Sequence, residues 1–273
     1  MRILAWDTSS LSGAIAALEI KSADSAAPFL KLLAEWSLQI EVKHSDSLLW
    51  GIHTTLEAAR WKLSDVDLFG VGLGPGSFTG LRVGITTART LAHTLNKPLV
   101  GVSSLLALAH PLADQWVVTG QPDTLIVAAT DACKGELFAL WGSAAQIRCK
   151  FQGSGDLTPP SCEGVFTYDS LYDQLKKEFE PESQQDRKWV AIGEAVDRYP
   201  SFFSKFSQTL RAELPGPFCH AVQGRSVGIL CWDAWKSRAE TLLSTSPLEV
   251  FPRYLRASSA EVTLAARTQV ILE

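Results

Sequence analysis

The sequence predicts an α/β protein in which mixed sheets are flanked by helices. Three apolar segments of strand length come first, and helical and strand segments then alternate along the chain. This order is typical of layered α/β folds, and the early run of strands favours a mixed sheet over a purely parallel one. In addition, the plan of residues 3–18 returns at residues 125–140, which favours two related halves.

The individual elements follow from hydrophobic periodicity and from helix start and stop signals. Ser45 can cap a first helix, and Pro98 stops a second one. In the first half we expect strands at residues 2–7, 14–20, 29–40, 67–74 and 99–104, and helices at about 45–61, at about 80–96 and from 104. In the second half we expect a strand, glycine turn and helix start at 189–199, a helix at 226–235 and a partly extended segment at 247–256.

The internal repeat divides the chain. Residues 3–18 (ILAWDTSSLSGAIAAL) and 125–140 (LIVAATDACKGELFAL) each contain an apolar strand ending in aspartate, a turn with glycine and a second apolar strand. Two unrelated hairpins could share this plan, but the wide separation favours duplication of a half-domain. We therefore expect halves at residues 1–107 and 108–273, with the last helix able to pack back on the first half.

Composition restricts the function. The 273 residues are 46% hydrophobic and carry a formal net charge of −4, which argues against a broad nucleic-acid-binding face but leaves room for a small basic patch. The five cysteines form no C-x-x-C pair, a pattern typical of reduced thiols in the cytosol. No apolar run approaches the ~18–20 residues of a membrane span, and the N-terminus does not resemble a signal peptide. We expect a cytoplasmic protein.

The glycine-rich stretch GPGSFTGLRVG, residues 74–84, joins an expected strand to an expected helix. It lacks the lysine of a Walker loop and does not fit the dinucleotide pattern G-x-G-x-x-G. Two interpretations remain open. Gly74 and Gly76 can allow a tight turn with unusual φ angles, or the N–H groups at the helix N-terminus can attract an anion.

The two expected helices near residues 45–61 and 80–96 have features of a docking surface. Small residues recur every four positions in the second helix, which permits close approach of another helix, and two tryptophans lie beyond the core stripe of the first. The alternative is that this chain covers them itself. The expected partner interface comprises Trp50, His53, Glu57, Trp61, Gly80, Leu81, Gly84, Ile85, Ala88 and Ala92.

Polar residues in the two hairpin turns suggest a ligand cleft that is only half equipped. Asp7, Thr8 and Ser9 could orient a metal-bound water and bind phosphate, or form an ordinary turn. In the second copy Ala132 and Cys133 replace the hydroxyls. We therefore predict no catalytic and no metal-binding residue, because the histidine spacing fits no zinc site and Ser77 lies outside a G-x-S-x-G motif. The vestigial cleft candidates are Asp7, Thr8, Ser9, Gly74, Gly76 and Asp131.

Several motifs, in this order, resemble those of the TsaB (YeaZ) family over nearly the whole chain. They are AWDTS, KHSDSLL, GLGPGSFTGLRVGITTARTLA, GVSSLLALA, ATDACKGELFAL, AIGEAVDRY and PRYLR. The resemblance implies an actin-like fold of the sugar kinase and Hsp70 type, made of two related halves. It also implies that His44 matches the first of two metal-binding histidines in the TsaD relatives, while Leu48 replaces the second.

The same resemblance implies a function. TsaB proteins are considered non-catalytic subunits that bind and activate TsaD, which threonylcarbamoylates the adenosine next to the anticodon in tRNAs reading codons that begin with A. It further implies an association with TsaE through the TsaB–TsaD complex, only indirect contact with tRNA and a homodimer when isolated. No cofactor is expected to bind tightly, with ATP or ADP held at most at an interface with partner subunits. The alternative is an actin-fold ATP-binding enzyme, an ATPase or transferase, and a peptidase is much less favoured.

Overall fold

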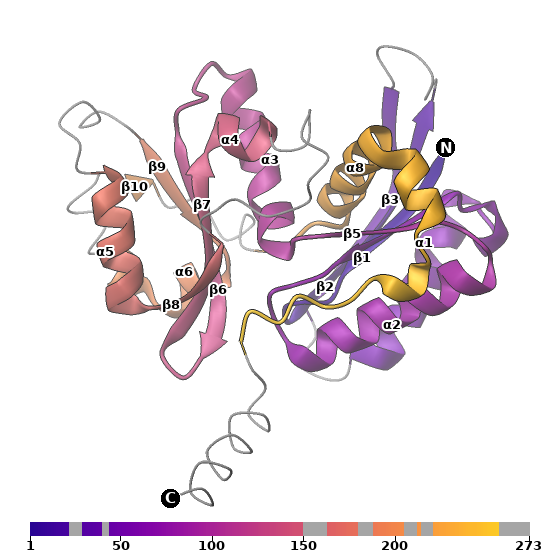
Figure 1. Ribbon diagram of the computed structural model, residues 1–273, viewed down its shortest axis with the longest axis horizontal. Helices are drawn as coiled ribbons and strands as arrows, with labels where there is room; N and C mark the ends of the chain where they lie inside the picture. Colours follow the sequence, from indigo (N-terminus) through magenta and orange to yellow (C-terminus); the bar gives the residue numbers. More distant parts are fainter. Residues whose placement is uncertain are drawn as a thin grey trace, which may run out of the picture.

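A computed structural model shows how the chain folds (Figure 1). It contains two five-stranded sheets, side by side, with helices packed against them. No helix among the described residues has the length and apolar character needed to cross a membrane. The structure describes residues 1–21, 29–39, 44–149, 163–179, 188–204, 212–213 and 221–256.

The first sheet has the order β3-β2-β1-β4-β5. β1 pairs antiparallel with β2 and parallel with β4, so the sheet is mixed, as expected. Every expected strand of this half is confirmed. The bounds are β1 (Arg2–Asp7), β2 (Ser12–Lys21), β3 (Phe29–Gln39), β4 (Leu68–Gly72) and β5 (Leu99–Val102).

The second sheet repeats this topology. Its order is β10-β9-β6-β7-β8, and β6 pairs antiparallel with β7 and parallel with β9. β6 therefore occupies the place of β1, and β9 the place of β4. The two sheets confirm the duplicated, actin-like α/β fold. The bounds are β6 (Leu125–Cys133), β7 (Glu136–Ser143), β8 (Gly164–Thr167), β9 (Trp189–Ile192) and β10 (Ala212–Glu213).

Helices cover both faces of the first sheet. Because side chains alternate along a strand, Leu4 and Trp6 of β1 pack with helices α1 (His44–Ala59) and α2 (Phe78–Thr94). Ile3 and Ala5 face the other side, in the cluster that includes helices α3 (Ser104–Val118) and α8 (Gly224–Ser244). The shorter helices are η1 (Leu63–Asp65), α4 (Ala144–Cys149), α5 (Tyr168–Phe179), α6 (Glu194–Arg198) and η4 (Pro247–Glu249).

Helix α8 belongs to the C-terminal part of the sequence, yet it packs on β1, β2 and β5 of the first sheet (Figure 1). Gly228 lies against Leu18 of β2, and the Cys231 thiol donates a hydrogen bond to the Val100 carbonyl oxygen at 3.4 Å. The Cys231 thiol is fully buried, and this burial strongly raises its pKa. The division of the chain between residues 107 and 108 stays a prediction.

Helix boundaries differ slightly from expectation, for local reasons. Helix α2 begins at Phe78, not Gly80, because the Ser77 hydroxyl caps it by accepting a hydrogen bond from the Gly80 N–H at 3.2 Å. Helix α1 ends at Ala59 because Arg60 adopts a left-handed φ of 58°. The expected cap, Ser45, has a side chain outside the described residues.

The C-terminal segment of residues 250–256, which we call the strap, connects the two halves (yellow in Figure 1). The Arg253 N–H donates to the Leu73 carbonyl oxygen at 2.9 Å, next to the glycine turn of the first half. The Arg256 guanidinium donates to the Ala132 carbonyl oxygen at the β6–β7 turn of the second half. The strap therefore connects the glycine turn of the first half to the β6–β7 turn of the second half.

Candidate functional site

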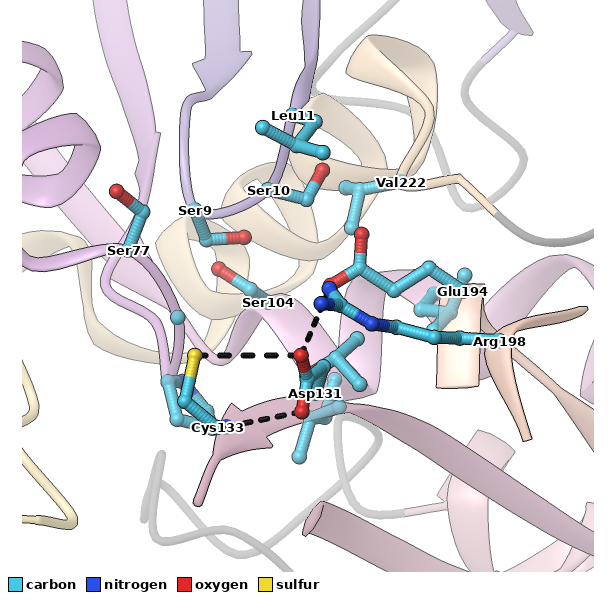
Figure 2. Close-up of a pocket in the computed structure, with 15 residues that line it drawn as sticks. Ser9, Ser10, Leu11, Ser77, Ser104, Asp131, Cys133, Glu194, Arg198 and Val222 are labelled. Atoms are coloured by element: carbon cyan, nitrogen blue, oxygen red, sulfur yellow. Dashed lines mark hydrogen bonds and ion pairs between the residues drawn. The ribbon is translucent and has the colours of Figure 1, made fainter. Parts of the chain in front are cut away.

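A cavity of about 250 Å³ lies between the two halves (Figure 2). The first half contributes the β1–β2 turn and the glycine turn, and the second half contributes the end of β6 and helix α6. Of the predicted cleft residues, Ser9, Gly76 and Asp131 line this cavity, whereas Asp7, Thr8 and Gly74 do not. The sequence thus located the cleft, but only half of its predicted residues face it.

Asp7 is sealed beneath the cavity. Its side chain is fully buried, and its Oδ1 accepts hydrogen bonds from the Ser9 N–H at 2.8 Å and the Ser9 hydroxyl at 2.6 Å. Its Oδ2 accepts one from the Ser104 hydroxyl. A Cβ at Gly72 would overlap this oxygen, so the carboxylate is enclosed on that side as well. Asp7, a vestigial cleft candidate, therefore does not face the cavity, because the chain itself provides its hydrogen-bond partners.

Thr8 and the glycine turn also act within the chain. The Thr8 hydroxyl donates to the Gly80 carbonyl oxygen at 2.7 Å and so joins the end of β1 to α2. The Gly74 N–H donates to the Ser104 hydroxyl at 3.0 Å, and the Ser77 N–H donates to the Ser9 carbonyl oxygen at 2.6 Å. These N–H groups are therefore not free for a phosphate. The tight-turn interpretation is favoured, and the φ of 93° at Gly74 explains why glycine is needed there.

Asp131 reproduces the local geometry of Asp7. Its Oδ1 accepts from the Cys133 N–H at 2.9 Å, two residues further on, just as Asp7 does with the Ser9 N–H. Asp131 differs in its other partners, since it pairs with the Arg198 guanidinium at 2.8 Å and accepts from the Tyr199 hydroxyl at 3.0 Å. Figure 2 shows the Asp131–Arg198 pair on one wall of the cavity, opposite Ser9 and Ser104.

Glu194 places a second carboxyl group in the cavity wall. Burial raises its pKa, and the charge of Asp131 nearby raises it further. Glu194 therefore adds an acidic group to a wall on which the Arg198 guanidinium already balances the charge of Asp131. Sequence reasoning gave no cleft role to Ser104 and Arg198, although the helix starts at GVSS and GEAVDR were visible signals.

Most of the predicted interface residues are buried in this chain. A Cβ at Gly84 would overlap the Thr8 hydroxyl, and the Trp6 indole N–H donates to the Gly84 carbonyl oxygen at 3.1 Å. The small-residue stripe thus lets α2 approach β1, not a partner helix. The assignment is therefore wrong for the buried residues, which are Trp61, Gly80, Leu81, Gly84, Ile85, Ala88 and Ala92.

Trp50, His53 and Glu57 remain on the surface of α1. Trp50 is 51% exposed, and the imidazole of His53 lies 3.4 Å from the Glu57 carboxylate. The Trp50 ring packs edge-on against Trp36 of β3, with centroids 4.5 Å apart. Leu49, next to Trp50 on α1, is also exposed, and these two residues with the half-buried Trp36 define what we call the α1–β3 face.

No group of three His, Cys, Asp or Glu side chains placed to hold a metal ion occurs among the described residues. Leu48, at the position of the second family histidine, is buried in the core beneath α1. The side chain of His44 lies outside the described residues.

The strap carries a buried ion pair. The Glu163 side chain is fully buried, and its carboxylate contacts the Arg253 guanidinium at 3.1 Å and accepts a hydrogen bond from the Ser103 hydroxyl at 3.0 Å. Burial raises the pKa of Glu163, while Arg253 acts in the opposite direction. Residues 103, 163 and 253 thereby tie together three distant parts of the sequence.

We expect Glu163→Gln to flatten the pH dependence of stability above the group's ordinary pKa of 4.5. The raised pKa means that the folded chain keeps this proton to higher pH than the unfolded chain does. The contribution of Glu163 to stability is therefore complete below 4.5 and decreases as the pH rises through the folded pKa. Urea unfolding of both proteins at about pH 5 and pH 7 measures this. If the free energy of unfolding changes equally between these two pH values in the unaltered chain and in Glu163→Gln, the prediction is contradicted.

The comparisons with known proteins agree with this fold. The family model described as TsaD, tRNA N6-adenosine threonylcarbamoyltransferase, matches residues 39–262. The chain belongs to this family. Two curated relatives are the tRNA threonylcarbamoyladenosine biosynthesis proteins TsaB of Escherichia coli (27% identity, 62% of this chain) and Bacillus subtilis (33% identity, 50% of this chain). The matches span 65% and 53% of those two proteins, less than two thirds of their lengths.

A solved structure extends the likeness. YeaZ from Pseudomonas aeruginosa superposes with a TM-score of 0.64 at 21% identity, covering 93% of this chain and 99% of that one. Within the TsaD family, the similarity is thus to TsaB (YeaZ) proteins, and the resemblance predicted from the motifs is confirmed.

Proposed function

We propose that this chain is a non-catalytic subunit that binds and activates a TsaD-type protein. The joint product is threonylcarbamoylated adenosine next to the anticodon in tRNAs reading codons that begin with A. The curated relatives are described as tRNA threonylcarbamoyladenosine biosynthesis proteins, which supports a role in the same modification. The partners that we propose are TsaD directly and TsaE through the complex of the two, in the cytoplasm.

The observation that carries this proposal is the α1–β3 face. Trp50 at 51% and Leu49 at 58% exposure, next to the half-buried Trp36, leave an apolar area in water. Clustered exposed apolar side chains mark interaction sites, and tryptophan is a frequent anchor in interfaces. β3 is also an edge strand of its sheet, so its outer backbone is available for pairing. We propose that a related subunit covers this face, and that a second copy of this chain does so when no TsaD is present.

The state of the cleft supports a non-catalytic role without a tightly bound cofactor. An ATP-binding enzyme of this fold class would use the hairpin aspartate and the glycine turn to hold metal and phosphate. Here Asp7 is enclosed by Ser9, Ser104 and the backbone at Gly72, and N–H groups of the turn bond within the chain. We propose that ATP or ADP binds, if at all, where partner subunits meet. Calorimetry of the isolated chain with Mg-ATP tests this, and micromolar binding with turnover would favour the enzyme alternative.

We expect Trp50→Glu to weaken binding to the TsaD-type partner by about 30-fold or more, as for an interface hot spot. The charge would have to be desolvated in the interface, and the contact with Trp36 would be lost. Titration of a labelled partner measures the dissociation constant, and circular dichroism checks the fold.

The matched control is Val118→Glu. Val118 is 71% exposed at the end of α3, away from the α1–β3 face. The Val118→Glu substitution should leave the dissociation constant for the partner unchanged. If Trp50→Glu binds the partner as tightly as this control does, the α1–β3 face is not the docking surface.

A further inference from the structure

A second exposed cluster, distinct from the α1–β3 face, combines aromatic rings with arginines. On α2, the Arg82 guanidinium lies 3.8 Å from the centroid of the Phe78 ring, and Arg82 Nε donates to the Tyr254 hydroxyl at 3.3 Å. The Phe78 and Tyr254 rings lie 4.9 Å apart. Two helical turns further along α2, Arg89 lies 4.9 Å from the ring of Phe251, which belongs to the strap.

A groove of about 430 Å³ adjoins this cluster between the strap and the β6–β7 turn. Phe78 and Tyr254 form one side of it, and Lys134 lies in the β6–β7 turn on the other. We call the groove and the cluster the Arg–aromatic groove. Its residues are Phe78, Arg82, Arg89, Lys134, Phe251, Tyr254 and Arg256.

The charge of this groove is positive. Arg256 pairs with Glu136 at 3.4 Å, but Arg82, Arg89 and Lys134 form no ion pair with any carboxylate that the structure describes. The carboxylate of Asp131, which also borders the groove, is held by Arg198. Three uncompensated cations therefore gather on one side of a chain whose net charge is −4.

This combination selects one kind of occupant. Phe78 and Phe251 each have a guanidinium over one ring face, and both remain partly exposed together with Tyr254. Such rings beside cations fit a flexible polyanion that carries flat rings, because bases stack on aromatic side chains and on guanidinium planes while phosphates contact arginine and lysine. An acidic peptide would use the cations but not the ring faces. The volume of the groove accommodates a nucleobase.

We propose that the Arg–aromatic groove binds unpaired nucleotides of an RNA. One base stacks against Phe78 and Tyr254, and neighbouring phosphates contact Arg82, Arg89 and Lys134. This deepens the proposed function, from which the RNA is taken to be the tRNA substrate. It also replaces the indirect tRNA contact expected from sequence with a direct one.

The groove is preorganised for such binding. The strap is fixed beside it by the Arg253–Glu163 pair and by the bond from the Arg253 N–H to the Leu73 carbonyl oxygen. Phe78 and Arg82 lie on a regular helix, and the Tyr254 hydroxyl bonds to Arg82 Nε. Side chains that are already ordered lose less entropy on binding, which favours affinity.

The test is fluorescence anisotropy with the full chain and two labelled probes, an unmodified tRNA and a single-stranded RNA of about 12 nucleotides. Tyr254→Leu should weaken binding of both by about 5- to 100-fold through lost stacking. Arg82→Gln with Arg89→Gln should weaken binding and lower the salt dependence, log K against log salt, by about 1.4. The charge-matched control, Arg60→Gln with Lys177→Gln, should change neither, since Arg60 directly follows α1 and Lys177 lies on α5, outside the Arg–aromatic groove.

Competitors distinguish the occupant. Unlabelled RNA should displace the probes, whereas AMP and a glutamate-rich peptide should not. Full displacement by AMP would indicate a pocket for free nucleotides, and equal displacement by the peptide would indicate unspecific charge attraction; either result overturns the proposal. Equal affinity of Tyr254→Leu and the unaltered chain would overturn it as well.

The proposed function and the RNA-binding proposal can be refuted independently of each other. Trp50→Glu should lose the TsaD-type partner but keep RNA binding, while Tyr254→Leu should lose RNA binding but keep the partner.

Discussion

Replacing Gly80 by alanine is expected to lower the free energy of unfolding by about 3 kcal/mol. A Cβ at Gly80 would overlap the carbonyl oxygen of Thr8, which is backbone and cannot rotate aside. The Thr8 hydroxyl bonds to the Gly80 carbonyl oxygen at 2.7 Å, so separating α2 from β1 would also break this contact. The helix propensity of alanine offsets only about 1 kcal/mol of the loss. Urea unfolding followed by circular dichroism measures the effect.

Gly13→Ala is the control for this prediction. No heavy atom lies within 4 Å of a Cβ built at Gly13, so a methyl group there meets open space. We expect its stability to change by no more than about 0.5 kcal/mol. If both variants unfold at the same urea concentration, α2 does not approach β1 as closely as the structure shows.

The small-residue stripe of α2 shows what periodicity can and cannot predict. The spacing of Gly80, Gly84 and Ala88 predicted the close approach of another helix, whereas Thr8 at the end of β1 occupies the space at both glycines. The spacing could not identify the approaching element, because small residues only provide space, and a strand of the same chain uses it as well as a partner helix does. The prediction of Trp61 as an interface residue is wrong for a similar reason, since its side chain is buried in a core cluster of this chain. The exposed Trp50 has the same sequence signal but the opposite environment.

The fold was more predictable than the site. The repeated strand–turn–strand plan around Asp7 and Asp131 was sufficient to predict two related mixed sheets, because the antiparallel hairpin at the centre of each sheet forms between strands adjacent in sequence. The interior of the cleft depends on contacts across long separations. Ser104 reaches Asp7 over 97 residues, and Arg253 reaches Glu163 over 90. No local pattern shows that such pairs will meet, so the sealed aspartate and the strap required the structure.

Asp7→Asn is expected to destabilise the chain by about 3 kcal/mol without affecting any nucleotide binding. The buried carboxylate accepts three hydrogen bonds, two from Ser9 and one from Ser104. The side-chain amide of asparagine has only one acceptor oxygen. Its NH₂ group would face the Ser9 or Ser104 donor that bonds to the carboxylate in the unaltered chain. Hydrogen bonds to charged groups contribute about 1.5–3 kcal/mol each, although such losses do not add fully.

The equivalent aspartate of the second half is the matched control. Asp131→Asn removes the charge but keeps an oxygen that can accept from the Cys133 N–H. Its ion-pair partner Arg198 is 60% exposed, so water can replace much of the lost interaction at the guanidinium. We expect a cost of about 1 kcal/mol there. Urea unfolding of both variants gives the difference, and calorimetry with Mg-ATP provides the second measurement. In an ATP-using enzyme Asp7 would hold metal, and its replacement would abolish nucleotide binding while leaving stability equal or higher. That result would show that Asp7 serves chemistry and not the joining of strand β1, the glycine turn and helix α3.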